Sequence, residues 1–241
     1  MNKLSCKYGF ILICIMLILG SFASCSDNDD KNITVSELSG VWCTPIRIDE
    51  SVPTLSIQSS LAESTMSNAL ISLLTSELTK QMANVNVIRL KFDEPAGYKF
   101  SFEWIEKGKD KVQVYPDILA LNYKEDSSTL YILINEDLIN LLGVVLKERG
   151  SVLPIDQIKG LLVKINGNYT LPIQMKQDGD IRTFYLTKEV TLPLVKLFAP
   201  LVESSLPETV SAMLPQLMEA VSATDYFNIG LRFKKDEAIE K

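Results

Sequence analysis

Cys25 is the residue of this sequence whose type and setting most directly allow covalent chemistry. It follows Phe22-Ala23-Ser24 and precedes the acidic run "SDNDD" over 26–30. Its sulfur can take a diacylglyceryl group, and its amine can take a further acyl chain once the preceding peptide bond is cleaved. Each acyl methylene buried in a bilayer contributes about 0.8 kcal/mol, so two or three chains hold a protein firmly at a membrane. We therefore expect Cys25 to be lipidated.

The segment before Cys25 has the layout of a secretory signal. Lys3 and Lys7 precede an apolar run over 10–19, and small residues follow it. The run is shorter than the roughly 20 apolar residues of a membrane-spanning helix. Ala23-Ser24-Cys25 resembles the bacterial lipobox, with Phe22 where leucine is usual. The alternative is ordinary secretion with an incidental cysteine. We predict a lipoprotein signal peptide over 1–24 and an acidic, lipidated tether over 25–35.

The acidic run after Cys25 also bears on location. It resembles the export tag of surface-exposed lipoproteins of Bacteroidota, which implies a lipid-anchored protein of the outer membrane that faces the cell exterior. Short acidic, polar runs also stay solvated and unfolded simply because they have little apolar surface to bury. Both interpretations place a spacer between the lipid anchor and the folded domain.

Composition then limits the classes of partner and site. Removing residues 1–24, with Lys3 and Lys7, would leave 217 of the 241 residues and 22 of the 24 basic side chains against 30 acidic ones, a net charge of −8. That balance argues against a nucleic-acid partner. Cys43 is then the one thiol left beside Cys25, so no disulfide within the domain is expected. One domain held by its core is the natural expectation at this length.

The absence of histidine from the sequence excludes the commonest catalytic arrangements. Histidine-based triads, the usual general base and the usual zinc ligand are all missing. The sequence also lacks the glycine-rich phosphate and dinucleotide motifs, so we expect no metal, no cofactor and no enzyme activity. Carboxylates alone could still form a glycosidase pair, and the candidates near strand ends are Asp93, Glu94, Glu103 and Glu106.

Alternating apolar residues predict a mostly β domain over 36–235, followed by a charged tail over 236–241. Ile88, Leu90 and Phe92 alternate with charged residues. Asn166-Gly167 and Asp178-Gly179 predict tight turns, with glycines at positive φ, between three further strands. Together with "LSGVWCT" at the start and "YFNIGLRFKK" at the end, the pattern predicts eight or nine mostly antiparallel strands.

Three helical regions interrupt the strands. An apolar stripe at i+4 spacing predicts a helix after the capping box at Ser60, with members Met66, Leu70, Leu74, Leu78 and Met82. A second helix is expected from Asn135 to Gly150. A third region over 192–222 should be broken or kinked by Pro193, Pro200, Pro207 and Pro215.

Several of these segments resemble the lipocalin-like (calycin) domains of uncharacterised Bacteroidota surface lipoproteins. They are "LSGVW", "LYILINEDLINLL" and the final "FNIGLRFKK", set around the amphipathic helix. The resemblance implies an α+β, mostly β fold: an antiparallel up-and-down barrel of about eight strands with inserted amphipathic helices. The alternative is a sheet curled around long helices, as in tubular lipid-binding proteins. The resemblance implies no activity.

Three functions remain open. A barrel of this size can hold one small hydrophobic ligand, and the walls would be Leu70, Leu74 and Leu78 from the helix with Phe100, Phe102 and Trp104 from a strand. Such stripes are also what packed core looks like; Trp42 and Cys43 are expected to be core. The second function is therefore a structural or accessory surface protein with a solid core, in a glycan-uptake or adhesion assembly whose protein partner is unknown. The third is the carboxylate hydrolase.

The lipidation hypothesis predicts a loss of membrane retention in Cys25→Ala. Because no other residue of the expected mature N-terminus carries a thiol, the variant should accumulate as an unprocessed precursor or as a soluble species. Partitioning of wild type and variant between detergent and aqueous phases measures this. Detergent-phase partitioning of processed Cys25→Ala would show that the anchor is elsewhere.

Overall fold

The computed structural model describes residues 37–43, 55–60, 65–82, 85–93, 99–106, 112–114, 121–126, 128–137, 139–140, 144, 155–202 and 208–236. The expected signal segment, the tether and Cys25 lie outside these ranges.

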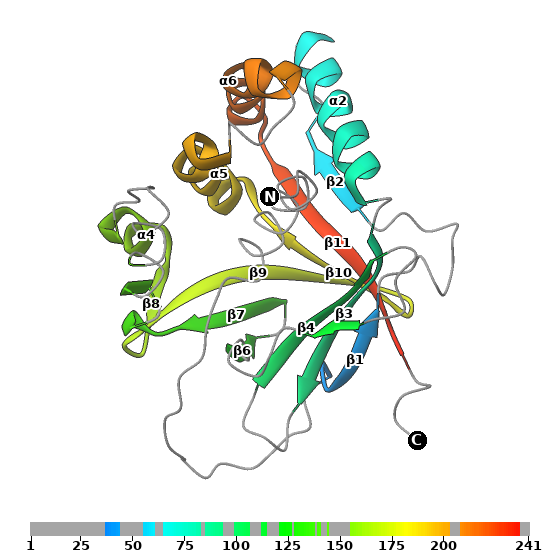
Figure 1. Ribbon diagram of the computed structural model, residues 1–241, viewed down its shortest axis with the longest axis vertical. Helices are drawn as coiled ribbons and strands as arrows, with labels where there is room; N and C mark the ends of the chain where they lie inside the picture. Colours follow the sequence, from blue (N-terminus) through cyan, green and yellow to red (C-terminus); the bar gives the residue numbers. More distant parts are fainter. Residues whose placement is uncertain are drawn as a thin grey trace, which may run out of the picture.

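A single antiparallel sheet dominates the fold and curls strongly (Figure 1). Its strands follow the path β1 (Gly40–Cys43), β3 (Val85–Asp93), β4 (Lys99–Glu106), β6 (Leu121–Asp126), β7 (Thr129–Ile134), β9 (Asn168–Asp178), β10 (Ile181–Leu186), β11 (Phe227–Lys235) and β2 (Leu55–Ser59). The short strands β5 (Val112–Val114) and β8 (Val163–Ile165) pair with β4 and β9. The predicted antiparallel, mostly β fold with inserted helices is confirmed.

The curl brings the first strand back to the last. Along one edge of β11, β2 pairs with residues 227–231, and β1 pairs at Lys234 and Lys235. The other edge of β1 pairs with β3 from Gly40↔Phe92 to Cys43↔Arg89. A hydrogen bond from the Asp236 amide to the Val41 carbonyl, at 2.7 Å, extends the short β1–β11 ladder.

One face of the sheet is apolar on β1, β3, β7, β9, β10 and β11 and forms the main core. Ile88, Leu90 and Phe92 on β3 are buried, as their alternation predicted. The registers connect this face to Trp42, to Ile132 and Leu171, and to Phe184 and Leu231. On β11 the same face runs through Phe227, Ile229, Leu231 and Phe233.

Both predicted hairpin turns are present. Asn166 (φ 49°) and Gly167 (φ 85°) connect β8 to β9, which fits a type I′ turn because both central residues have positive φ. At the second turn, Asp178 still pairs with Ile181, so the loop residues are Gly179 and Asp180. Gly179 (φ 60°) occupies the first central position, as a type II′ turn requires.

Four helices with defined bounds lie to one side of the sheet: α2 (Thr65–Met82), α4 (Ile155–Leu161), α5 (Lys188–Val202) and α6 (Glu208–Ser222) (Figure 1). They contact one another in the order α2, α6, α5, α4. Ile71 on α2 and Val221 on α6 pack on Phe227, whereas Leu194 on α5 belongs to the main core. The helices therefore cover the N-terminal half of the apolar face of β11. Lys188 also donates hydrogen bonds to the carbonyls of Ser222 and Thr224 at the end of α6.

The sequence prediction differs from the structure at four places. β2 and α4 were not predicted, because β2 alternates only Leu55 and Ile57 with small polar residues and α4 is barely two turns long. The strand predicted before Asn166 is short, since β8 begins at Val163, two residues after the end of α4 at Leu161. The third region is divided into α5 and α6 as expected, but both helices continue through prolines, at 193, 200 and 215. Packing against the sheet and neighbouring helices outweighs the hydrogen bond lost at each proline.

The helix expected from Asn135 does start there, since Glu136, Asp137, Ile139 and Asn140 are helical. Pro207 and the expected end at Gly150 lie outside the described residues.

At Gly230 the neighbouring strand β10 leaves no room for a side chain. A Cβ atom built on Gly230 would lie 2.7 Å from the Tyr185 Cα and would overlap the Phe184 carbonyl oxygen. Both are backbone atoms, so a small rotamer change cannot remove the clash. Glycine at this position lets two adjacent strands coil tightly over the core.

We expect Gly230→Ala to lower the free energy of unfolding by about 2 kcal/mol or more, in the upper part of the range for overpacking. The matched control is Gly160→Ala: no atom lies within 4 Å of a Cβ at this exposed position in α4. It should be neutral or stabilising by up to about 1 kcal/mol, because alanine favours helix. Urea denaturation of both variants compares the effects. Equal stability of the two would contradict the close approach at Gly230.

Candidate functional site

Arg182 is a buried charge on the apolar face of the sheet, at the end where β1 and β11 meet. Its position on β10 is opposite Phe233 on one side and Gln177 on the other, and only 8% of the residue is exposed. Its Nε donates a hydrogen bond of 2.7 Å to Gln177 Oε1. Its guanidinium carbon lies 4.9 Å from the centre of the Trp42 ring. In the folded protein, an aromatic face and an amide therefore replace the water that would otherwise solvate the guanidinium.

The start of the described chain crosses this same end. Glu37 Oε2 accepts a hydrogen bond of 3.3 Å from Arg182 Nη2, and Leu38 is fully buried. Trp42 Nε1 donates a hydrogen bond of 2.9 Å to the Leu38 carbonyl. Trp42 therefore makes two contacts. Its indole N–H binds the chain before β1, and its ring face contacts Arg182. We call this group (Glu37, Leu38, Trp42, Gln177 and Arg182) the tether-side end, because residues 25–35 lead directly to it.

The energies of the three Arg182 contacts differ. The Glu37 side chain is 89% exposed, and exposed ion pairs contribute between zero and about 1 kcal/mol. A cation over a desolvated tryptophan contributes about 2 kcal/mol, and a hydrogen bond to a charged group about 1.5–3 kcal/mol. Trp42 and Gln177 are therefore the main partners of Arg182, and Glu37 adds a weaker link to the preceding chain.

Aromatic rings cross the interior of the curled sheet next to Arg182. Phe92 on β3 contacts Tyr123 edge-on, with centroids 5.1 Å apart, and stacks on Phe184 of β10 at 6.1 Å. Phe184 meets Phe233 at 5.6 Å. Because β1 and β11 lie between β3 and β10 in the sheet, the Phe92–Phe184 contact crosses the inside of the curl. Aromatic side chains of the described residues therefore meet in the interior at this level.

The described part of the α2 stripe packs on other elements. Leu70 is buried, and Leu74 packs with Ile71, Val221 and Phe227 between α2, α6 and β11. The strongest contacts of α2 are with α6 and β2. Ile71 was not predicted to pack here, because it lies one position beyond a member of the i+4 series. The side chain of Leu78 lies outside the described residues.

Of the residues predicted to line a ligand site, the three on β4 can be located only from the strand register. Phe100, Phe102 and Trp104 lie opposite Phe92, Leu90 and Ile88, so the backbone puts them on the core face of β4. Their side chains lie outside the described residues. A cavity shared by these three residues with Leu70, Leu74 and Leu78 stays a prediction.

The candidate carboxylates are spread along the β3–β4 ladder. Glu103 is opposite Arg89 and Glu106 is opposite Val85. At about 3.4 Å per residue, these positions lie about 14 and 27 Å from Asp93 along the strands. A glycosidase needs its two carboxyl groups about 5–10 Å apart. The ladder gives no support for a pair that includes Asp93; Glu94 lies outside the described residues.

Cys43 lies on the outer face of β1 and is not activated. The residue is buried, its Sγ donates a hydrogen bond of 3.3 Å to Asp236 Oδ2, and it forms no disulfide. Burial is the main reason that the pKa of the Cys43 thiol rises to about 11; Arg89 opposes the rise and Asp236 adds to it. Thiolate is therefore scarce at neutral pH, in agreement with the predicted core role. Within the described ranges no three histidine, cysteine or acidic residues are placed to hold a metal ion.

The sequence analysis did not single out Arg182. In "DIRTFYLT" both alternating sets contain apolar residues, so the pattern does not say which face is buried. Once the register of the hairpin is known, Arg182 is seen to lie on the same face as Phe184 and Leu186. A charge at such a position must find partners or disrupt the core.

Comparison of the chain with protein-family models, curated proteins and solved structures gave no match. Among the described helices, none has the length and apolar character needed to cross a membrane.

We expect Arg182 and Trp42 to be energetically coupled. In a double-mutant cycle of Arg182→Met and Trp42→Leu, the coupling free energy should be about 1–2 kcal/mol, because each single change removes the same cation–π contact. Arg232→Met is the matched control: Arg232 lies on the opposite face of β11 and donates to the Leu55 carbonyl. Urea denaturation of the single and double variants gives both couplings. Additivity of the Arg182 and Trp42 changes would rule the contact out as a source of stability.

Proposed function

We propose that the chain is a lipid-anchored, non-catalytic protein of the cell envelope, in which a lipocalin-like barrel with a solid core acts as a structural or accessory surface module. The observation that carries the solid core is the Phe92–Phe184 contact across the interior of the sheet. The anchor rests on the sequence around Cys25, and so does the location at the outer membrane with the domain on the cell surface.

The barrel assignment is supported by the order of the strands. Eight strands on the path from β1 to β11 follow chain order once β2, β5 and β8 are set aside, all neighbours are antiparallel, and β1 pairs with both β3 and β11. This is up-and-down connectivity that returns to its start. The alternative fold is a sheet curled around long helices. It is supported by α5 and α6, which cover the same apolar face farther along β11.

Packing favours the solid core over a ligand cavity. Phe92, Phe184 and Phe233 are nearly inaccessible to solvent, and their ring contacts are at the usual spacing of aromatic pairs. A cavity for a small molecule typically has about 300 Å³ or more. The rings and the Arg182 guanidinium, all buried, lie in the part of the interior near the tether-side end, which supports the solid core.

A hydrophobic small molecule is the second candidate. It would lie between α2 and β4, against Leu70, Leu74 and Leu78 on one side and Phe100, Phe102 and Trp104 on the other. The observation in its favour is that Leu70 is buried and yet, among the residues that the structure describes, is in neither apolar cluster of the sheet.

Native mass spectrometry of protein purified without detergent distinguishes the two candidates. The solid-core proposal predicts the bare mass of the chain, apart from its N-terminal lipid. It also predicts that Phe184→Ala lowers the free energy of unfolding by about 3–5 kcal/mol, as for other buried phenylalanines. Thr183→Ala, on the outer face of the same strand, is the control and should cost far less. A co-purifying hydrophobic molecule that is lost in Leu70→Ala would replace the solid-core proposal with the ligand binder.

A further inference from the structure

The guanidinium of Arg182 is held in one orientation by two partners that are themselves fixed. Its Nε donates to Gln177 Oε1, and Gln177 Nε2 in turn donates to the Gly179 carbonyl in the β9–β10 turn. The Trp42 ring centre lies 4.9 Å from the guanidinium carbon, and the indole N–H of Trp42 is bound to the Leu38 carbonyl. Backbone carbonyls therefore position both partners, and the guanidinium is preorganised in the way that a binding site requires.

The remaining edge of this guanidinium, formed by Nη1 and Nη2, has one partner among the described residues. Nη2 donates a hydrogen bond of 3.3 Å to Glu37 Oε2. Nη1 forms no hydrogen bond to a described residue, and it is not fully enclosed, so water still reaches it. A guanidinium carries five N–H donors and does not lose its charge in proteins. Donors at this edge therefore remain for an oxygen ligand.

Glu37 makes only part of the contact that this edge allows. Its side chain is 89% exposed, and one of its oxygens meets one guanidinium nitrogen. A carboxylate that approaches along the axis of the guanidinium forms two parallel hydrogen bonds, one to each Nη. Because the next residue, Leu38, is fully buried, the backbone of Glu37 cannot shift freely to reach this geometry. A free carboxylate has no such restraint.

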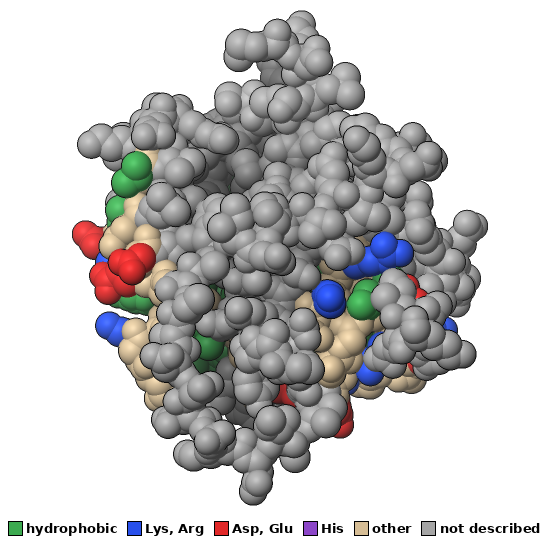
Figure 2. All heavy atoms as spheres, turned by 60° about the horizontal axis from the view of Figure 1, so that its bottom comes forward, with side chains coloured by type: hydrophobic (Ala, Val, Ile, Leu, Met, Phe, Trp, Pro, Cys, Tyr) green, Lys and Arg blue, Asp and Glu red, His purple; other side chains and the backbone are tan. Residues whose placement is uncertain are grey.

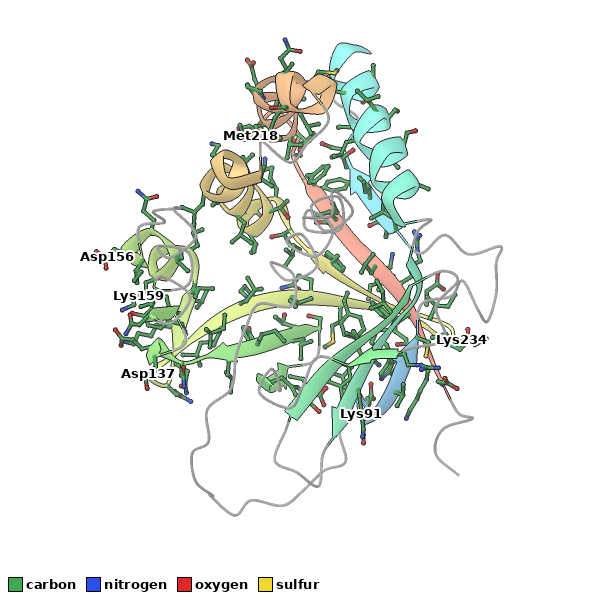
Figure 3. The ribbon with its side chains drawn as sticks, viewed as in Figure 1. Lys91, Asp137, Asp156, Lys159, Met218 and Lys234 are labelled. Atoms are coloured by element: carbon green, nitrogen blue, oxygen red, sulfur yellow. The ribbon has the colours of Figure 1, made fainter. Side chains whose placement is uncertain are left out.

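Other acidic side chains of the described chain lie elsewhere or have other partners. At the same end of the sheet, Asp180 pairs with a lysine of β11, and Asp236 accepts a hydrogen bond from the thiol of β1. The largest group of acidic side chains in Figure 2 lies on the left flank, which is the side of α4. Figure 3 shows Asp137 and Asp156 on that side, whereas the β9–β10 turn next to Arg182 lies at the right. Glu37 is therefore the acidic partner that a ligand has to replace.

We propose that the Nη edge of Arg182 is a binding site for a small carboxylate, and that Glu37 occupies this edge until such a ligand replaces it. The proposal goes beyond the structural or accessory role, because it gives the domain a small-molecule ligand. It does not depend on the lipid anchor. The carrying observation is a guanidinium that is oriented by Trp42 and Gln177 and 90% buried at its side chain, with a single, exposed carboxylate on its outer edge.

The chemistry of the site favours a carboxylate over other anions. A planar carboxylate matches the two parallel donors of the fork, and its single charge balances the single charge of the guanidinium. The Trp42 ring excludes water from one side, and hydrogen bonds are electrostatically stronger where water is excluded. Lys235, opposite Trp42 on the same face, has interactions of its own. The proposed site therefore uses one cation.

Acetate is the probe, because it presents a carboxylate and little else. With so few atoms it should bind in the millimolar range at best, so the site is measured by titration. The thermal midpoint of the purified protein should rise to a plateau in sodium acetate, relative to sodium chloride at equal ionic strength, because only the folded state holds the site. In NMR spectra the indole N–H resonance of Trp42 should shift along the same binding curve.

Three variants test the roles of the side chains. Glu37→Gln removes the competing carboxylate and should lower the half-saturating acetate concentration by about two- to fivefold, since an exposed ion pair contributes at most about a factor of five. Asp180→Asn removes a different carboxylate at this end and is the matched control; it should leave the curve unchanged. Arg182→Lys keeps the charge but loses the fork, and it should weaken binding about tenfold or more.

Two results would overturn the site. One is acetate binding that is no tighter in Glu37→Gln than in wild type. The other is an equal rise of the thermal midpoint in wild type and Arg182→Lys, because a general effect of acetate on stability acts on every variant alike. Glu37 is exposed, so Glu37→Gln tests the proposal even if Arg182→Lys does not fold. Tighter binding of inorganic phosphate than of acetate to the wild type would overturn the assignment to a carboxylate.

Discussion

The guanidinium of Arg182 loses its hydration when the sheet curls, and the groups that replace its water hold the two ends of the sheet together. Burial of an unpaired charge costs several kcal/mol. The replacements come from separate segments: the Trp42 ring from β1, the Gln177 amide from β9, and Glu37 from the chain before β1. The β1–β11 ladder contains two residue pairs and the hydrogen bond from Asp236 to Val41, so the contacts of Arg182 add to a short ladder. Satisfying Arg182 therefore requires β1 to be in place, and the closure of the sheet depends on that requirement.

The interior follows from this closure. With β1, β3 and β11 drawn toward β10, Phe92 reaches Phe184 from the opposite wall, and Tyr123 and Phe233 complete the row of rings. Such tight coiling brings β10 and β11 so close at Gly230 that no side chain fits between them. Farther along β11, toward Phe227, apolar residues of α2, α5 and α6 pack on the same face. The helices thus continue the core from the point where the rings end.

Much of this architecture could be predicted from local patterns. Period-two alternation located β3, β4, β7 and β11, and the glycines at 167 and 179 located both hairpins, because these signals depend on neighbouring residues only. The role of Arg182 could not be predicted, since it depends on which face of β10 is buried, and a long-range register decides that. β2 was missed for a similar reason: its partner, residues 227–231, lies far away in the sequence. The continuation of α5 and α6 through prolines reflects packing that no local signal contains. The predicted ligand site was based on stripes of apolar residues, and such stripes occur in packed cores as well as in cavities. Its members with described side chains, Leu70 and Leu74, are at least partly buried.

The two ends of the molecule differ in the chemistry that they offer. At the tether-side end, the buried guanidinium of Arg182 contacts the Trp42 ring, the Gln177 amide and the Glu37 carboxylate. At the helical side, the described residues of α5 and α6 include many apolar side chains that are only half-buried, among them Leu192, Val195 and Met218. The apolar face of the sheet is thus covered by helices at one end and closed by Arg182 with its partners at the other.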